Sequence, residues 1–307
     1  MSSQTNKQPT LKKISKGLTV GSVMTGSTFF HGPPVLALGL TKLFKKSKKV
    51  DETNIKITNS WLMVNNWLID HVLPNTKWDI TIDEGLDLNL QGRYLMTCNH
   101  QSWVDTTVNQ YFGLTRMPLT RFFTKWELIF IPFVGQAFKI LGFPMMKRHS
   151  KKQIAKNPEL KYRDMEEARK SCEQLLSQPF TLLNYLEGTR FTPEKHAQQQ
   201  SPYQNLLKPK AGGLALALNI LGDQVDALVD MTIVYPNGAP AYGEFWLGEV
   251  PRIAVDLRKI EIPTWVHGGN YEDDAEFREK FQHWVDELWT EKDQLITRMK
   301  AKYSVTE

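Results

Sequence analysis

The pattern of apolar and polar positions sets the first 75 residues apart from the rest of the chain. Residues 17–41 contain no Asp, Glu, Lys or Arg, and lysines lie on both sides of this stretch. Because Pro34 cannot continue a straight helix, the pattern predicts two short helices, residues 18–30 and 34–45. Positive flanks prefer the cytoplasmic side, so lysines at both ends favour a helical hairpin that dips into one leaflet. One transmembrane helix and a signal peptide remain alternatives.

A second apolar segment follows this stretch. Residues 55–73 carry large apolar side chains near helical spacing, which predicts an amphipathic helix that ends at Pro74. The helix either packs on a core or lies at a membrane interface beside the hairpin. We therefore predict an N-terminal membrane-associated helical segment, residues 1–75, and a second domain, residues 76–307.

The second domain alternates between strand-like and helix-like patterns. The predicted strands are residues 78–83, 93–98, 121–124, 143–146, 180–186, 227–235, 243–247 and 253–260. The predicted helices are residues 101–113, 126–138, 159–176, 212–221 and 273–302. Residues 191–207 are polar and rich in Gln, which predicts an exposed, mobile loop. Strands that alternate with helices predict an α/β fold in which helices flank a mostly parallel central sheet.

Composition and charge narrow the class of protein. With 41% apolar and 23% charged residues, the chain is neither a polytopic membrane protein nor disordered. The formal net charge of +5 favours anionic partners, such as a phospholipid surface, nucleic acid or a phosphorylated substrate. Nucleic acid is disfavoured because no known binding module is present. Cys98 and Cys172 suggest neither a disulfide framework nor a metal site, so a reducing compartment is the simpler interpretation.

The strongest chemical signal is a histidine and an aspartate separated by four residues. His100 follows the predicted strand 93–98, and Asp105 lies in the helical segment after it. At such a junction the carboxylate can hold one ring nitrogen as N–H, which leaves the other nitrogen free to accept a proton. Ser102 and Cys98 are alternative nucleophiles, but neither lies in a G-x-S-x-G context.

Four stretches in a fixed order add to this pair. They read Asn-His-Gln-Ser-Trp-Val-Asp at 99–105, Lys-Trp-Glu-Leu to Gly-Phe-Pro-Met-Met-Lys-Arg at 125–148, Tyr-Leu-Glu-Gly-Thr-Arg at 185–190, and Val-Asp-Met-Thr-Ile-Val-Tyr at 229–235. Together they resemble the glycerolipid acyltransferase family, which includes 1-acylglycerol-3-phosphate acyltransferases. The D-x-T pattern of Asp230 and Thr232 is similar to the lysocardiolipin acyltransferase-type branch. The resemblance covers about residues 90–295.

The resemblance implies transfer of a fatty acyl group from acyl-CoA or acyl-carrier protein to the free hydroxyl of a lysophospholipid, most simply 1-acylglycerol-3-phosphate. It implies that His100 is the general base and that Asp105 orients the ring. No cofactor beyond the thioester co-substrate and no metal is expected.

The resemblance also implies an acceptor-binding set. Glu187, Gly188, Thr189 and Arg190 are expected to bind the acceptor phosphate and to shape the active site. Arg148, with Lys147 beside it, is expected to close a second acceptor-binding block, and Lys125 is expected to contact phosphate or an oxyanion. Met145 and Met146 stand where the family commonly has Phe and Ile, which leaves the head group open.

Three alternatives stay open at this point. The acceptor could carry another head group, as in lysophosphatidylglycerol or lysocardiolipin. The protein could bind lipid at a membrane surface without catalysis, or it could hydrolyse a thioester with water in place of the lipid hydroxyl. The expected partners are a phospholipid membrane, an acyl thioester donor and a lysophospholipid, with no nucleic acid. The expected location is the cytoplasmic face of a membrane, namely a bacterial inner membrane.

Overall fold

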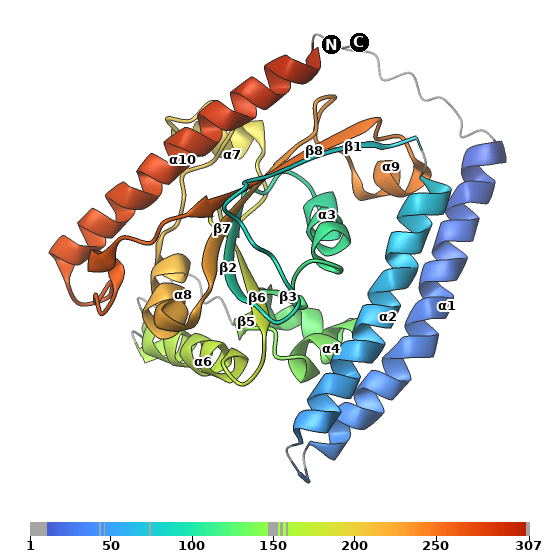
Figure 1. Ribbon diagram of the computed structural model, residues 1–307, viewed down its shortest axis with the longest axis horizontal. Helices are drawn as coiled ribbons and strands as arrows, with labels where there is room; N and C mark the ends of the chain where they lie inside the picture. The colour runs from blue at the N-terminus through green and yellow to red at the C-terminus, as the bar shows by residue number, and fades with distance from the viewer. Residues whose placement is uncertain are drawn as a thin grey trace.

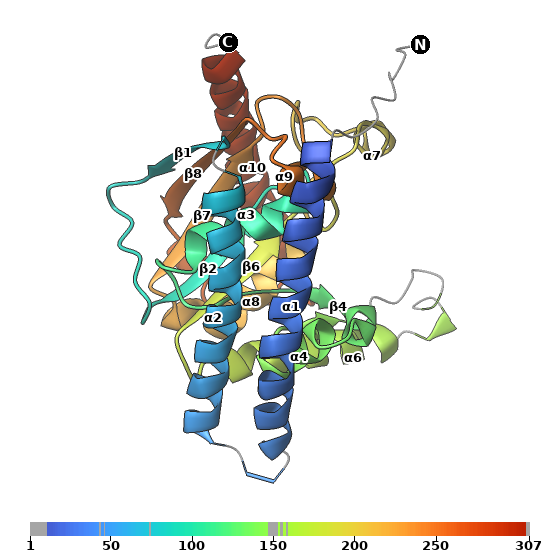
Figure 2. The same cartoon turned by 90° about the vertical axis from the view of Figure 1, so that its right-hand side faces the viewer.

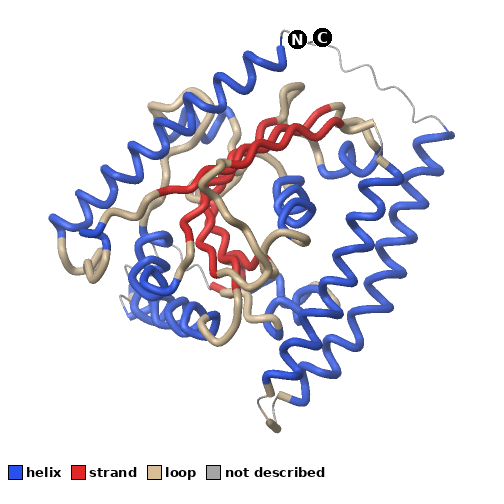
Figure 3. The backbone as a smooth tube through the Cα atoms, in the orientation of Figure 1, coloured by secondary structure: helices blue, strands red, loops and turns tan. Residues whose placement is uncertain are grey.

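The computed structural model describes residues 11–42, 44, 45, 47–73, 75–146, 153, 156, 157 and 159–304. A six-stranded sheet in the order β1-β8-β7-β2-β6-β3 forms its centre (Figures 1 and 3). Only the β7–β8 pair is antiparallel within this sheet, which confirms the predicted mostly parallel α/β fold. The strands are β1 (Lys77–Ile82), β2 (Arg93–Cys98), β3 (Thr120–Phe122), β6 (Phe180–Tyr185), β7 (Ala227–Val234) and β8 (Arg252–Ile260).

A smaller parallel sheet pairs β4 (Thr124–Lys125) with β5 (Met145–Met146). The predicted strand 121–124 is thus divided between two sheets. The segment between β4 and β5 contains a 3₁₀ helix, η1 (Trp126–Phe130), and a short helix, α4 (Val134–Ile140).

Helices cover both faces of the large sheet (Figure 1). One face carries α3 (Val104–Gly113), α9 (Tyr242–Leu247) and an antiparallel pair formed by α1 (Leu11–Thr41) and α2 (Lys48–Val72), which contribute to one apolar cluster. The other face carries α6 (Glu159–Leu175), α8 (Gly212–Leu221) and α10 (Ala275–Ser304), which contribute to a second cluster. Side chains of β7 alternate between these clusters, as the two-residue period of a strand requires.

The N-terminal hairpin differs from the prediction of two short helices. Helix α1 continues from Leu11 to Thr41 with Pro33 and Pro34 inside it, so the predicted break is wrong. The hairpin is formed by α1 and α2, which run side by side in Figure 2. Tertiary contacts hold α1 together across the prolines, because Val35 is fully buried and Gly32 lies directly against Phe133. Within the ranges given above, no helix is both long enough and apolar enough to cross a membrane.

Both ends of α1 contact the α/β core. Near its start, Lys16 Nζ donates to Leu247 O in α9 at 3.1 Å. Near its end, Gly39 approaches Ile140 of α4 so closely that a Cβ would clash with its side chain, and Lys42 Nζ donates to Ile140 O at 3.0 Å. The hairpin is therefore fastened to the core at two separate helices.

Two further predictions are corrected. Residues 243–247 are not a strand but belong to α9, whose first turn is closed by the bond from Ala241 N–H to Glu244 Oε2 at 2.7 Å. Residues 191–207 contain α7 (Pro193–Gln199), for which Thr192 is the N-cap. The end of this stretch is buried, and Trp289 Nε1 donates to Leu207 O at 2.9 Å. The apolar end of the segment thus joins the core against α10.

A buried ion cluster joins α10 to the sheet. Lys292 Nζ lies 2.7 Å from Asp230 Oδ1 and donates to Met231 O, also at 2.7 Å. Arg258 and Thr97 bond to the same carboxylate at 2.9 Å and 2.6 Å. Burial opposes ionisation of Asp230, but the charges of Lys292 and Arg258 together lower its pKa. Asp230 therefore links three strands and a helix through one charged group.

We expect Asp230→Asn to lower the free energy of unfolding by about 3 kcal/mol, because it leaves the Lys292 ammonium group buried without its counter-charge. Urea unfolding followed by circular dichroism measures this. The matched double variant Asp230→Leu/Lys292→Met removes both charges and should recover most of the loss. If the single variant were as stable as the wild type, the cluster would not brace the sheet.

Candidate active site

The sheet brings three chain segments to one edge. Strand β2 lies between β7 and β6 and is parallel to both, so their carboxyl ends meet. His100 follows β2, Glu187 follows β6, and Tyr235 follows β7. Asn99 extends the pairing beyond the last strand residue, because its side chain accepts from Ile233 N–H and donates to Ile233 O, both at 2.9 Å. The loop that carries His100 is therefore fixed to β7.

The Asp105 carboxylate gathers this loop around itself. Its Oδ2 atom accepts from His100 Nδ1 at 2.8 Å and from the backbone N–H groups of Gln101 and Ser102 at 2.7 Å and 2.9 Å. Its Oδ1 atom accepts from the Tyr235 hydroxyl at 2.6 Å. Asp105 is fully buried in the first turn of α3. Four donors around one acid match the acceptor-only chemistry of a carboxylate.

The His100 ring has a defined orientation. It stacks on Tyr185 with ring centroids 4.1 Å apart and an interplanar angle of 22°, and its side chain is 13% exposed. Because Nδ1 donates its hydrogen to Asp105, the neutral ring carries its lone pair on Nε2. No described residue forms a hydrogen bond with Nε2. Burial raises the pKa of the Tyr185 phenol well above its usual value, so the stacking partner stays neutral.

Glu187 supports the loop that carries His100 through hydrogen bonds to backbone. Its Oε1 atom accepts from His100 N–H at 2.7 Å, and its Oε2 atom accepts from Leu207 N–H at 2.9 Å. The segment after it returns to the histidine, because Phe191 N–H donates to His100 O at 2.7 Å. Burial raises the pKa of Glu187 to about 8, although both N–H donors favour its ionised form. With both oxygens bonded to backbone, Glu187 positions the loop.

The turn after Glu187 places a cation at the same edge. Gly188 has φ +65°, a conformation that favours glycine, and the chain turns there. The Arg190 guanidinium lies over the Trp103 indole, 4.5 Å from the ring centroid. Trp103 is three residues from His100, so this stack puts a positive group next to the histidine loop. A planar guanidinium is suited to binding phosphate oxygens.

Comparison with known proteins gives the family. Residues 79–236 match the family model described as acyltransferase. This chain belongs to the acyltransferase family. The match includes both members of the His100–Asp105 pair and the turn that carries Arg190, so the predicted resemblance to this family is confirmed.

Characterised relatives are similar at low identity. A 2-acyl-1-lysophosphatidylinositol acyltransferase of Saccharomyces cerevisiae is 25% identical over 68% of this chain and 62% of that protein. The chicken (Gallus gallus) lysocardiolipin acyltransferase 1 is 24% identical over 67% and 53%. The 1-acyl-sn-glycerol-3-phosphate acyltransferase 2 of Arabidopsis thaliana is 29% identical over 48% and 38%. The aligned parts of these relatives thus fall short of two thirds of their lengths.

A solved structure supports the fold. The crystal structure of PlsC, the 1-acyl-sn-glycerophosphate acyltransferase of Thermotoga maritima, superposes with a TM-score of 0.51 at 16% sequence identity. The superposition covers 92% of this chain and 97% of that one. At this identity the likeness extends to the arrangement of helices and strands.

Three further predicted site residues have no described contact with the histidine. Lys125 is exposed on β4, where it pairs in register with Met146. No described contact joins it to His100 or Asp105, so its role stays a prediction. Lys147 and Arg148 lie outside the described residues.

Neither alternative nucleophile is available: Ser102 is hydrogen-bonded to backbone, and Cys98 is buried as a neutral thiol. Ser102 Oγ donates to Pro240 O at 2.5 Å and accepts from Val104 N–H at 3.0 Å. Cys98 is fully buried, and burial raises the pKa of its thiol far above the usual value, which keeps it protonated. Neither side chain is arranged for attack on a thioester carbonyl.

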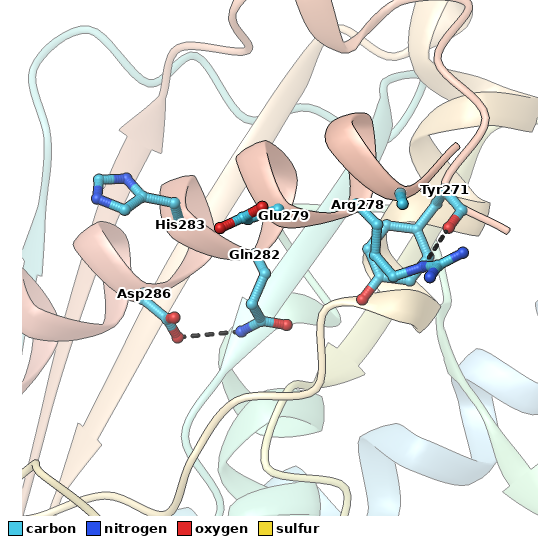
Figure 4. Close-up of a pocket in the computed structure, with 7 residues that line it drawn as sticks. Tyr271, Arg278, Glu279, Gln282, His283 and Asp286 are labelled. Atoms are coloured by element: carbon cyan, nitrogen blue, oxygen red, sulfur yellow. Dashed lines mark hydrogen bonds between the residues drawn. The ribbon is translucent and has the colours of Figure 1, made fainter. Parts of the chain in front are cut away.

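A surface groove of about 430 Å³ lies elsewhere, at the start of α10 (Figure 4). Its polar side chains include Gln282 and Asp286, which bond to each other at 3.0 Å. None of the predicted site residues lines this groove. The His100–Asp105 pair and Arg190 therefore follow the carboxyl ends of the central strands and do not line this groove.

Three residues around the site are not singled out by the sequence patterns. Tyr235 and Tyr185 were read only as parts of the family stretches, yet one bonds to Asp105 and the other carries the His100 ring. Lys195 was hidden in a segment predicted to be a loop. The strand order could have pointed to Tyr235, because it directly follows β7, the strand next to β2.

We expect Asp105→Asn to lower kcat by about a thousandfold, because the amide cannot stabilise the imidazolium that forms when His100 accepts a proton. Acceptor KM should change by less than about threefold, since Asp105 acts through His100. Steady-state rates with acyl-CoA and a lysophospholipid measure both constants. A matched variant, Tyr235→Phe, keeps the charge and should lose much less. Full activity in Asp105→Asn would contradict this role.

Proposed function

We propose that this acyltransferase transfers a fatty acyl group from acyl-CoA or acyl-carrier protein to the free hydroxyl of a lysophospholipid. The simplest acceptor is 1-acylglycerol-3-phosphate. The observation that carries the proposal is the His100 ring, held by Asp105 at Nδ1 and by Tyr185 across its face, with Nε2 available. Arg190 beside this loop supplies the charge that an anionic lipid head group requires.

The reaction balances without an acyl-enzyme. The lipid hydroxyl gives its proton to His100 Nε2 while its oxygen attacks the thioester carbonyl carbon. A new C–O bond forms, the C–S bond breaks, and the departing thiolate takes a proton from the imidazolium. Asp105 stabilises the positive ring between these two transfers. The substrate hydroxyl thereby takes the place of an enzyme nucleophile, which fits the occupied states of Ser102 and Cys98.

The activities named for the relatives support this class of acceptor. Two of them act on a lysophosphatidylinositol and on a 1-acyl-sn-glycerol-3-phosphate, and a third is a lysocardiolipin acyltransferase. Since the three names differ in head group, lysophosphatidylglycerol and lysocardiolipin remain the second candidates for the acceptor.

Exposed apolar side chains support the proposal that the protein binds a membrane surface. Phe29 and Phe30 lie on the outer face of α1 and are 63% and 75% exposed, and Phe130 of η1 is 77% exposed. Phe133, in the segment after η1, contacts α1, since its ring centroid lies 5.4 Å from that of Phe29. Its backbone has φ +63° in a tight turn closed by Val134 N–H and Pro132 O at 2.7 Å, a strained conformation.

This surface would rest on one leaflet, so that acceptor lipids reach His100 from the bilayer and thioesters reach it from solution. An exposed apolar patch of this kind is typical of a membrane-interaction surface. We place the enzyme at the cytoplasmic face of a membrane, with the bacterial inner membrane as the proposed setting.

The direct test is an assay of purified protein with acyl-CoA and a panel of lysophospholipids. We expect diacyl product in the wild type and a loss of at least about a hundredfold in His100→Ala, since general-base catalysis contributes about that much. Thioester cleavage without lipid product would instead indicate a hydrolase. Lipid binding without any turnover would indicate a non-catalytic binding protein.

The membrane surface has its own test. We expect Phe29→Ser/Phe30→Ser to bind vesicles of phosphatidylethanolamine and phosphatidylglycerol at least about tenfold more weakly, because each buried Phe contributes about 1.5–3 kcal/mol. Co-sedimentation measures the partition. The control, Leu90→Ser, removes an exposed apolar side chain from the loop before β2 and should bind like the wild type. Unchanged binding of the double variant would show that this patch is not the anchor.

A further inference from the structure

A second cation lies against the turn that carries Arg190. Lys195 Nζ donates to Thr189 Oγ1 at 2.8 Å and to Arg190 O at 2.9 Å. The lysine comes from the first turn of α7, and its own N–H bonds to the capping Thr192 Oγ1. Lys195 is therefore fixed both at its backbone N–H and at its ammonium group, which bonds to two successive residues of the turn.

A third cation approaches the same turn. A Cβ atom placed on Gly188 would lie 3.2 Å from Lys210 Nζ, so this side chain passes directly beside the glycine backbone. Lys195 and Lys210 thus approach the turn Gly188 to Arg190, whose own Arg190 is the third cationic side chain. Because the turn is bonded to His100 through Glu187 and Phe191, this charge lies next to the reacting histidine.

The Arg190 guanidinium lies over an aromatic side chain. The Trp103 indole is 55% exposed and supports the guanidinium 4.5 Å from its centroid. A stacked guanidinium keeps its edge, and hence its paired N–H donors, directed outward from the ring. Trp103 lies in the histidine loop, so the stack also ties the position of Arg190 to that of His100.

Two acids lie near this charge. Glu187 bonds to two backbone N–H groups beneath the turn. Glu194 is exposed, and its pKa is lowered by bonds to its own backbone and to Thr192 and, less strongly, by the charge of Lys195. In the part of the chain that the structure describes, neither Arg190 nor Lys195 forms a salt bridge. The arrangement suits a ligand with more than one negative charge.

We propose that Lys195, together with Arg190 held on Trp103, recognises a phosphate monoester at the end of the acceptor. The proposal rests on the proposed function and narrows its substrate class. A phosphate monoester carries about −1.5 to −2 charges and three acceptor oxygens, whereas a diester keeps one charge. The Arg190 fork takes two oxygens, and Lys195 adds a point charge for the third. Thr189 Oγ1 accepts from Lys195, so its own hydrogen can also be donated to phosphate.

The same chemistry could come from the thioester donor. Coenzyme A carries a phosphate monoester on its ribose, so a cation cluster could bind the donor instead of the acceptor. The two sources are separable, because acyl-dephospho-CoA lacks that group and lysophosphatidylglycerol lacks a terminal monoester.

The first experiment compares Lys195→Ala on two acceptors. We expect its KM for lysophosphatidate to rise about 10- to 100-fold with kcat within about threefold, because a charged contact to phosphate is lost. With lysophosphatidylglycerol we expect less than about a threefold change. Lys195→Arg should restore most of the KM. The control Lys170→Ala removes the same charge from an exposed position on α6 and should behave like the wild type.

Two results in this assay would overturn the proposal. An equal loss with both acceptors would mean that Lys195 only supports the turn. A loss that disappears when acyl-dephospho-CoA replaces acyl-CoA would assign the cations to the donor.

Trp103 gives an independent readout. Trp103→Ala frees Arg190, which serves both kinds of acceptor, so KM should rise for lysophosphatidate and lysophosphatidylglycerol alike. Trp103→Phe keeps an aromatic face and should lose less. A change in kcat with no change in either KM would contradict a role through Arg190.

Binding separates this inference from the proposed function. In the His100→Ala background, titration calorimetry with lysophosphatidate micelles reports affinity without turnover. We expect Lys195→Ala to weaken that affinity about tenfold or more and to leave lysophosphatidylglycerol unchanged. If this selectivity holds while the wild type transfers no acyl group, the proposed function fails and the monoester site stands. If the variant binds both lipids like its parent, the monoester site is refuted.

Discussion

The site depends on one buried carboxylate that accepts four hydrogen bonds. Asp105 holds the His100 ring, two backbone N–H groups of the loop before it, and the Tyr235 hydroxyl from the neighbouring strand. Without these bonds, the loop backbone and the two rings could take other positions. Because a carboxylate can only accept, the arrangement permits one orientation of the imidazole, with Nε2 directed away from the acid.

The topology of the sheet makes this arrangement possible. A parallel order of β7, β2 and β6 delivers the three loops to one edge, and Asn99 and Glu187 then bond the loops to one another beyond the strand ends. On the opposite flank, Lys292 and Asp230 fasten α10 to the same strands. The proposed catalytic loop therefore lies just beyond the ends of β2 and β7, and the ion cluster of Asp230 and Thr97 lies within the same two strands.

Much of the fold could be predicted from local patterns. Alternating apolar runs identified the strands of the large sheet, and the spacing of His100 and Asp105 with the Glu187–Arg190 turn identified the edge where they meet. The errors came from long-range packing. Helix α1 continues through Pro33 and Pro34 because α2 and α4 support it, and residues 243–247 form α9 since a side-chain cap outweighs a short apolar pattern. Lys195 could not be predicted because its role depends on the contacts of its ammonium group with Thr189 and Arg190, which sequence spacing does not indicate.

The attachment of α1 has a mechanical consequence. Lys16 bonds to Leu247 in α9, and the chain just before α9 holds the histidine loop, since Pro240 O accepts from Ser102 Oγ. At its other end α1 is fastened to α4 through Gly39, Lys42 and Ile140. A leaflet that drew the hairpin toward itself would therefore transmit the pull through α9 to the residues beside His100. If the proposed reaction takes place at a membrane, its rate would then depend on lateral pressure and lipid packing as well as on the supply of substrate.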